Sequence, residues 1–263
     1  MGAASNNIEM LRSALRAARM PFCAAGDIPI SQDIPIKLLF RVSEQGDHTS
    51  MNSVTFPLSK ADDINPLLEA CKQASFGRGS EEVLDPSYRR ALVLHADSFA
   101  IAPATAVDPY GLGMLAKIRQ SLLSDAPGAT NRGEDEVEYE DDYEEERPPQ
   151  GRRIVAHLDK MNVYGVGDFF KGHVDTPRSN QMLGTLVINL PVAHEGGHLV
   201  VHAPYPSGGA SGGDSGVAQS PLDGGPGQRD SYTTTWGSED VLSWVAFFSD
   251  CPHEVLPVKR GNR

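Results

Sequence analysis

The chain has 263 residues, of which 40% are hydrophobic and 22% charged, so it is long enough to bury a full core as one large or two small domains. Its net charge of -12 comes mainly from residues 134–146, EDEVEYEDDYEEE, which contain ten acidic residues and no basic one. The rest of the chain is close to neutral and gives no indication of a nucleic-acid partner.

No apolar run approaches the roughly 18 residues that a membrane span needs. The N-terminus lacks the apolar segment of a secretory signal. Three widely spaced cysteines without a C-x-x-C pair make no disulfide framework and favour a reducing compartment. We therefore expect a cytoplasmic or nuclear protein with no membrane partner.

Residues 1–123 are predicted to form a mixed α/β extension that packs on the remainder of the protein. Apolar residues at helical spacing predict helices over residues 5–20, 63–75 and 111–123. Short apolar runs predict strands over residues 36–42 and 53–58.

Residues 124–151 are polar, strongly charged and bracketed by Pro and Gly, so they cannot bury enough apolar surface to fold. They are interpreted as an acidic disordered insertion. A docking segment for a basic partner, over residues 134–146, is the alternative interpretation.

Residues 152–263 change to short β runs separated by Gly, Pro or Asp, which is typical of an antiparallel sandwich or barrel. Residues 206–230 interrupt these runs with a flexible Gly/Ser loop.

The β region contains the letters HEGGH, residues 194–198, which match the H-E-x-x-H motif of zinc proteases. That motif requires a helix, but two glycines separate the histidines and β runs flank them, and each glycine inside a helix costs about 1 kcal/mol. The segment is therefore interpreted as strand, Gly-Gly turn, strand, forming a hairpin. His194, His198 and His202 are expected to be surface or hairpin histidines.

A second metal-like signature is His173-Val174-Asp175. Residues i and i+2 of a strand point to the same face, so this imidazole and this carboxylate could converge on one ion. Two ligands are too few for an iron site of the facial-triad type, which needs a second histidine and leaves positions open. His253 follows a strongly apolar β run and is the candidate for the third ligand.

Ten residues after His253 comes Arg263. Pro257 and Gly261 allow the chain to reverse, so Arg263 could open the neighbouring strand beside His253. A guanidinium there could bind a carboxylate bidentately, although Lys259 and Arg260 compete with it. Three iron ligands with a carboxylate clamp indicate a 2-oxo diacid as cosubstrate.

Residues 153–263 resemble the Fe(II)/2-oxoglutarate dioxygenases, and specifically their prolyl 4-hydroxylase-like branch. The pattern that carries the resemblance is Tyr164-Gly165-Val166-Gly167, His173-x-Asp175, His253 and Pro257-x-x-x-Gly261-x-Arg263. Residues 21–30, 74–79 and 83–91 also resemble an N-terminal extension in largely fungal members of this branch.

The resemblance implies an α+β protein with a double-stranded β-helix, or jelly-roll, core and N-terminal helices. It implies that His173, Asp175 and His253 bind Fe(II), and that Arg263 and Tyr164 bind the distal carboxylate of 2-oxoglutarate. It further implies O2 as a reactant, succinate as a product and L-ascorbate as a supporting reductant, with hydroxylation of an unknown protein or small-molecule substrate.

The family pattern continues past the arginine as a further β strand, so the last core strand is expected to be missing here. A non-catalytic binding module on the same sandwich and an inactive truncated fragment are the alternatives to an active hydroxylase. Cys251 is expected to be a small buried apolar residue, Arg178 to face solvent, and Trp236 and Trp244 to lie in the core or a pocket wall.

Overall fold

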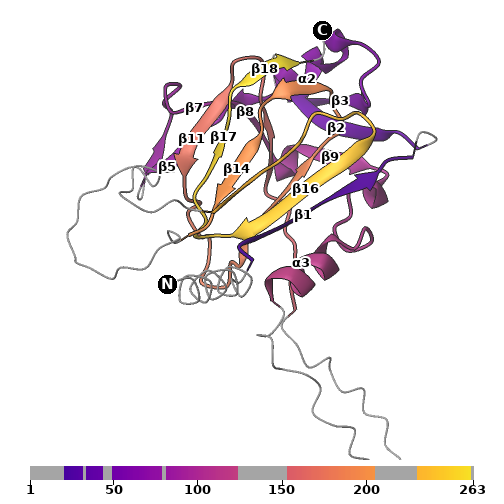
Figure 1. The fold of residues 1–263 in the computed structure, drawn as a ribbon. Helices are drawn as coiled ribbons and strands as arrows, with labels where there is room; N and C mark the ends of the chain where they lie inside the picture. Colours follow the sequence, from indigo (N-terminus) through magenta and orange to yellow (C-terminus); the bar gives the residue numbers. More distant parts are fainter. Residues whose placement is uncertain are drawn as a thin grey trace, which may run out of the picture.

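The computed structural model describes residues 21–31, 34–43, 49–78, 81–123, 153–204 and 230–261. The helix predicted over residues 5–20, the acidic insertion 124–151 and nearly all of loop 206–230 lie outside the described residues. Arg263 lies outside them as well. Strands dominate the described part, and the short helices lie around them (Figure 1).

The second half of the chain supplies most strands of two sheets. A five-stranded sheet has the order β15-β14-β17-β11-β7, where β7 (Arg89–Arg90) comes from the first half. A three-stranded sheet has the order β1-β16-β12, where β1 (Cys23–Pro29) comes from the first half, and β13 pairs with β18. The strands of this half are β10 (Lys160–Val163), β11 (Phe169–His173), β12 (Gly184–Asn189), β13 (His194–Gly196), β14 (Leu199–His202), β15 (Ser231–Thr233), β16 (Val241–Phe248), β17 (His253–Val255) and β18 (Val258–Gly261).

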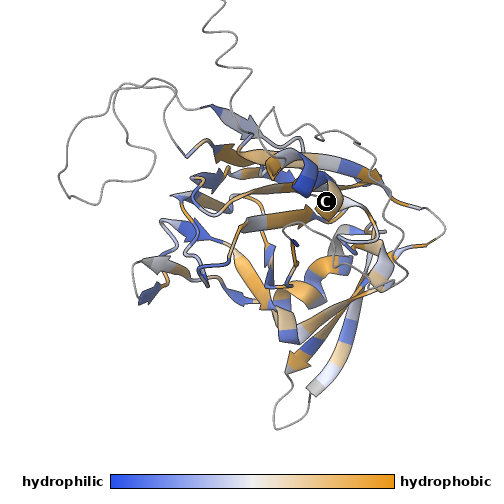
Figure 2. Cartoon of the chain, turned by 90° about the horizontal axis from the view of Figure 1, so that it is seen from below, coloured by the Kyte–Doolittle hydropathy of each residue, from blue (hydrophilic) through white to orange (hydrophobic). Residues whose placement is uncertain are grey.

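Strand β16 lies between β1 and β12 and separates two apolar clusters. Its side chains alternate, so Leu242 and Trp244 belong to one cluster while Val245 and Phe247 belong to the other. Because both faces are covered, its sequence VLSWVAFF reads as a nearly continuous apolar run rather than an alternating one. Figure 2 shows how apolar and polar residues mix along the other strands.

The first half of the chain adds strands to these sheets and also forms sheets of its own. Strand β1 pairs with β16, β7 with β11, and β8 with β10. The remaining strands of this half form a three-stranded sheet β3-β2-β9, a β5-β6 pair, and β4 beside β8. The strands are β1 (Cys23–Pro29), β2 (Ile36–Ser43), β3 (Thr49–Phe56), β4 (Lys72–Gln73), β5 (Phe76–Arg78), β6 (Glu81–Val83), β7 (Arg89–Arg90), β8 (Leu92–His95) and β9 (Phe99–Ala102).

The helices of the first half are shorter than the sequence predicted. They are η1 (Ala61–Ile64), α2 (Asn65–Ala70), η2 (Ala96–Ser98), η3 (Ala104–Ala106) and α3 (Met114–Leu122). The helix predicted over 63–75 ends at Ala70. The next residue, Cys71, has an extended backbone, because Lys72 and Gln73 pair with β8. The helix predicted over 111–123 begins only after Gly113, which has a φ of 72°.

The prediction of a hairpin at HEGGH is wrong in its pairing. Strands β13 and β14 both form, and Gly196 and Gly197 adopt φ values of 74° and 66° between them. However, β13 pairs with β18, whereas β14 pairs with β15 and β17. The two glycines therefore carry the chain from one sheet to another.

The prediction that Arg263 opens a strand beside His253 falls outside the described residues, and the last described strand is β18. Strand β18 already begins at Val258 and pairs with β13 rather than with β17. Val258 also exchanges backbone hydrogen bonds with the loop before β11, since its amide donates to Asp168 and its carbonyl accepts from Gly167. These two sets of bonds hold β18 against both β13 and the loop before β11.

No helix in the described ranges is both long and apolar enough to cross a membrane.

Candidate metal centre

Two neighbouring strands of the five-stranded sheet bring His173, Asp175 and His253 together. His173 ends β11, Asp175 follows two residues later, and His253 opens β17. Strands β11 and β17 are antiparallel, with His173 directly opposite His253 and an irregular register between Phe170 and His173. One ligand atom from each residue lies within 4.8 Å of the others.

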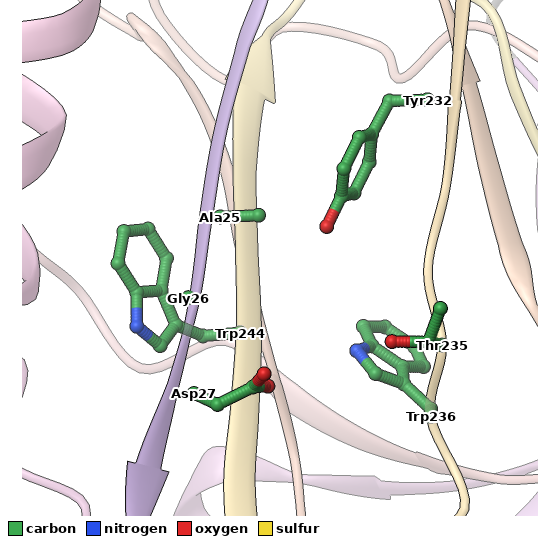
Figure 3. Close-up of a pocket in the computed structure, with 7 residues that line it drawn as sticks. All are labelled: Ala25, Gly26, Asp27, Tyr232, Thr235, Trp236 and Trp244. Atoms are coloured by element: carbon green, nitrogen blue, oxygen red, sulfur yellow. The ribbon is translucent and has the colours of Figure 1, made fainter.

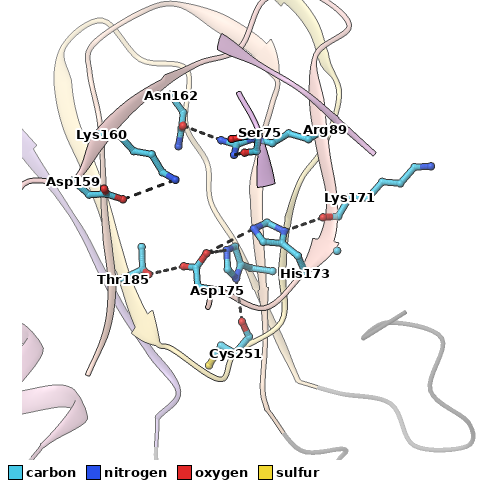
Figure 4. A network of polar contacts seen from close by, with 12 residues as sticks. Ser75, Arg89, Asp159, Lys160, Asn162, Lys171, His173, Asp175, Thr185 and Cys251 are labelled. Carbon is cyan, nitrogen blue, oxygen red and sulfur yellow. Dashed lines mark hydrogen bonds and ion pairs between the residues drawn. The ribbon is translucent and has the colours of Figure 1, made fainter. Parts of the chain in front are cut away.

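Both imidazoles direct the same nitrogen toward the carboxylate. Oδ1 of Asp175 lies 3.9 Å from Nε2 of His173 and 3.7 Å from Nε2 of His253. The other ring nitrogen, Nδ1, lies 2.9 Å from the carbonyl of Lys171 in His173 and 3.0 Å from that of Cys251 in His253 (Figure 4). A carbonyl accepts the Nδ1 proton, so Nε2 keeps a free lone pair, as metal-binding histidines require.

The carboxylate of Asp175 is oriented in a similar way. The hydroxyl of Thr185, on β12, donates to Oδ2 over 2.6 Å, which leaves Oδ1 facing the histidines. Thr185 belongs to the opposite sheet, where it lies beside Phe247 of β16. The carboxylate is therefore held between the two sheets.

The protonation states suit a cation site. Burial, helped by the neighbouring His253, lowers the pKa of His173 to about 3, so its ring is neutral at neutral pH. Burial opposes ionisation of Asp175, but His253, the Thr185 hydroxyl and His173 together hold the pKa of its carboxyl below its usual value. A neutral imidazole and an ionised carboxylate are the forms that bind metal ions.

Tyr164 lies just after β10 and is close to the side chain of Arg89. Burial raises the pKa of its hydroxyl, while the charge of Arg89 and a hydrogen bond from it act in the opposite direction. Tyr164 thus keeps its proton and can donate a hydrogen bond inside the fold.

Several lesser candidates lie where they contribute no ligand to the triad. Cys251 is fully buried, with Sγ 3.7 Å from the carbonyl of Phe22. Arg178 is largely exposed and pairs with Asp159 at 2.5 Å. Glu195, the second residue of HEGGH, is exposed and pairs with Arg260 at 2.7 Å. His194, His198 and His202 are half-buried rather than on the open surface.

Arg89 is the residue that motif reasoning missed. It lies on β7, is 5% exposed, and faces Phe170 across the β7–β11 pair. The sequence offered only the resemblance of residues 83–91 to an N-terminal extension. Nothing in that segment's composition indicates that one of two adjacent arginines is buried near the triad.

A separate hollow of about 250 Å³ lies beside β1 and β16, away from the triad. It is lined by Ala25, Gly26, Asp27, Tyr232, Thr235, Trp236 and Trp244 (Figure 3). Both tryptophans are therefore pocket wall, and Trp244 also belongs to the core at 3% exposure. None of the triad residues contributes to this hollow, so it does not bear on the metal site.

The family comparison agrees with this geometry. Residues 160–263 match the family model of the 2OG-Fe(II) oxygenase superfamily. The match begins at β10 and includes every triad residue. No curated protein matches the chain significantly.

The superfamily match supports a dioxygenase that uses iron, 2-oxoglutarate and O2. The strand-rich fold is consistent with the jelly-roll core of this superfamily. The donor set also fits the metal, because two imidazole nitrogens and one carboxylate oxygen form the facial triad of non-haem Fe(II) oxygenases.

Proposed function

We propose that this chain is an Fe(II)- and 2-oxoglutarate-dependent dioxygenase that hydroxylates its substrate and converts 2-oxoglutarate to succinate. The observation that carries the proposal is the convergence of His173, Asp175 and His253, each oriented by a second group. The superfamily match supports the same reaction type.

In this proposal the three side chains would hold Fe(II), and the cosubstrate and O2 would react at that site. The bound iron would supply the oxidising chemistry. The protein's part is to direct Nε2 of both histidines and Oδ1 of Asp175 toward one another, and to fix all three side chains against rotation through the Lys171, Cys251 and Thr185 contacts.

We further propose that Tyr164 and Arg263 bind the distal carboxylate of 2-oxoglutarate, and that L-ascorbate supports turnover. The Tyr164 lead-in and the spacing from His253 to Arg263 favour the prolyl 4-hydroxylase-like branch, so a protein prolyl residue is the first substrate to test.

The decisive experiment compares the wild-type chain with Asp175→Ala and His253→Ala. Anaerobic titration with Fe(II) and 2-oxoglutarate is expected to give the visible absorption of an iron-bound 2-oxo acid in the wild type only. Under air, the wild type should form succinate and both variants should lose at least 100-fold in rate, because two ligands hold iron poorly.

The matched controls are Asp97→Ala and His95→Ala, which remove the same side-chain types from exposed positions. Both controls should behave as the wild type. Equal iron binding and succinate formation in Asp175→Ala would reject the triad, and a wild type that binds neither Fe(II) nor 2-oxoglutarate would favour a non-catalytic binding module.

A further inference from the structure

The hollow beside β1 and β16 combines aromatic side chains with a carboxylate that has no counter-charge. Its lining includes Tyr232, Trp236 and Asp27, with Thr235 beside them (Figure 3). Asp27 is exposed and forms no hydrogen bond or ion pair with any other residue in the described ranges. The hollow therefore offers a ligand both aromatic surface and an unpaired negative charge.

The alternation of side chains along β1 places Asp27 beside the aromatic rings. Residues 23, 25 and 27 share one face of the strand, and Cys23 and Ala25 pack against the apolar cluster that includes Tyr232 and Trp236. Asp27 continues this row where the apolar residues end. Burial raises the pKa of the Tyr232 hydroxyl, and Cys23 and Asp27 act in the same direction, so the ring is neutral and lies within electrostatic reach of Asp27.

Lys117 lies on the other face of β1 and leaves Asp27 unpaired. A Cβ at Gly26 would come within 2.9 Å of Nζ of Lys117, and this Nζ lies 5.5 Å from the centre of the Trp244 ring. Gly26 and Asp27 are adjacent in the strand, so they face opposite sides. Figure 3 agrees, because the ring of Trp244 lies across β1 and β16 from Trp236.

We propose that the hollow between Asp27, Tyr232 and Trp236 binds a methylated ammonium group, carried by a free small molecule or by a methylated lysine side chain. Aromatic faces attract such cations, and the carboxylate supplies the counter-charge. An unmethylated ammonium is strongly hydrated and loses more on leaving water. The volume of about 250 Å³ lies below the about 300–1,000 Å³ of pockets for drug-sized ligands, so the hollow suits a small head group. The net charge of -12 favours the approach of cations.

The test titrates the full-length chain with choline and with 3,3-dimethylbutanol, which has the same shape but carbon in place of the charged nitrogen. The chain has two tryptophans and both border the hollow, so quenching of their fluorescence reports binding. Choline is expected to bind at least tenfold more tightly than the uncharged alcohol. Asp27→Asn should weaken choline at least fivefold and change the alcohol less than twofold. Asp97→Asn, which removes an exposed carboxylate elsewhere, should change neither.

Two substitutions at Tyr232 separate the ring from its hydroxyl. Tyr232→Phe keeps the aromatic face and should bind choline within twofold of the wild type, whereas Tyr232→Leu should weaken choline at least threefold. Because Asp27 is exposed, Asp27→Asn remains a valid test even if Tyr232→Leu does not fold.

A peptide with one trimethyllysine, compared with the same peptide carrying unmodified lysine, distinguishes the two sources of the cation. Tighter binding of the methylated peptide than of choline assigns the site to a protein partner, and weaker binding assigns it to a small molecule. The proposal is overturned if choline and the uncharged alcohol behave alike, or if Asp27→Asn leaves choline binding unchanged. None of these titrations needs iron or 2-oxoglutarate, so their outcome is independent of the proposed function.

Discussion

At the scale of single residues, the ordering of the triad depends on groups that touch no metal. Lys171 and Cys251 contribute only backbone carbonyls, which no side-chain substitution removes. Thr185 contributes a hydroxyl, so it is the one contact of this set that mutation can remove cleanly.

Thr185→Val should weaken metal binding while leaving all three metal ligands in place. The change keeps the shape of the side chain but removes the donor to Oδ2 of Asp175, so the carboxylate can rotate. Loss of such a supporting contact typically costs 10–100-fold in metal affinity. Competition with a chelator, using Co(II) as a spectroscopic probe, measures the change.

Thr185→Ser is the matched control, because it retains the hydroxyl and should bind within about threefold of the wild type. If valine and serine at this position bind the metal equally well, the hydroxyl has no supporting role.

At the scale of elements, the strands β11, β12 and β17 must keep their mutual positions for the site to exist. Strand β12 lies so close to β16 at Gly184 that a Cβ there would come within 2.0 Å of the carbonyl oxygen of Phe247. The residue next to Gly184 is Thr185, so the position of this strand is transmitted directly to Asp175.

Gly184→Ala is therefore expected to lower stability and metal affinity together. Relief of a backbone collision requires β12 to shift, and overpacking of this kind costs about 1–3 kcal/mol. Thermal unfolding and the Co(II) titration report the two effects. Gly165→Ala, where a Cβ would meet its nearest neighbour at an ordinary 3.4 Å, should change both by far less. Unchanged unfolding in Gly184→Ala would mean that β12 tolerates the displacement.

The sequence predicted some of these elements much better than others, for physical reasons. Strand β2 shows alternating burial of Ile36, Leu38 and Phe40. The strand predicted over residues 36–42 agrees with its observed bounds to within one residue. Strand β1, CAAGDIP, has neither alternation nor bulk and is a strand because it pairs along its whole length with β16. Pairing partners distant in sequence leave no local pattern, which is also why the β13–β18 pair was missed.

The residues of the candidate site also differ in whether a local sequence pattern indicates them. His173 and Asp175 share a local spacing that a sequence pattern can show, although β11 ends at His173, and His253 follows a strong apolar run. Arg89 has no such local signal, because its burial depends on β7 joining β11 some 80 residues later. Sequence could thus indicate the three ligands, but not the buried arginine that the first half of the chain brings near them.

At the scale of the whole molecule, the two halves of the chain share their sheets. The matched segment 160–263 contains β11, β16 and β10, and each of these strands has a neighbour from the first half. Removing the first half would leave strand edges unpaired and would remove apolar contacts across β16.

A chain of residues 153–263 alone is therefore expected not to fold. It would expose the edge of β16 that β1 covers along seven residue pairs, and lose the cluster that holds Leu242 and Trp244. Circular dichroism during heating should show no cooperative transition, and Co(II) should not bind, whereas the full chain should melt in one step. A deletion of residues 134–146 tests whether any shortening has this effect, and it should leave the transition and Co(II) binding intact. A cooperative transition with metal binding in residues 153–263 would show instead that the first half is dispensable for both the fold and the site.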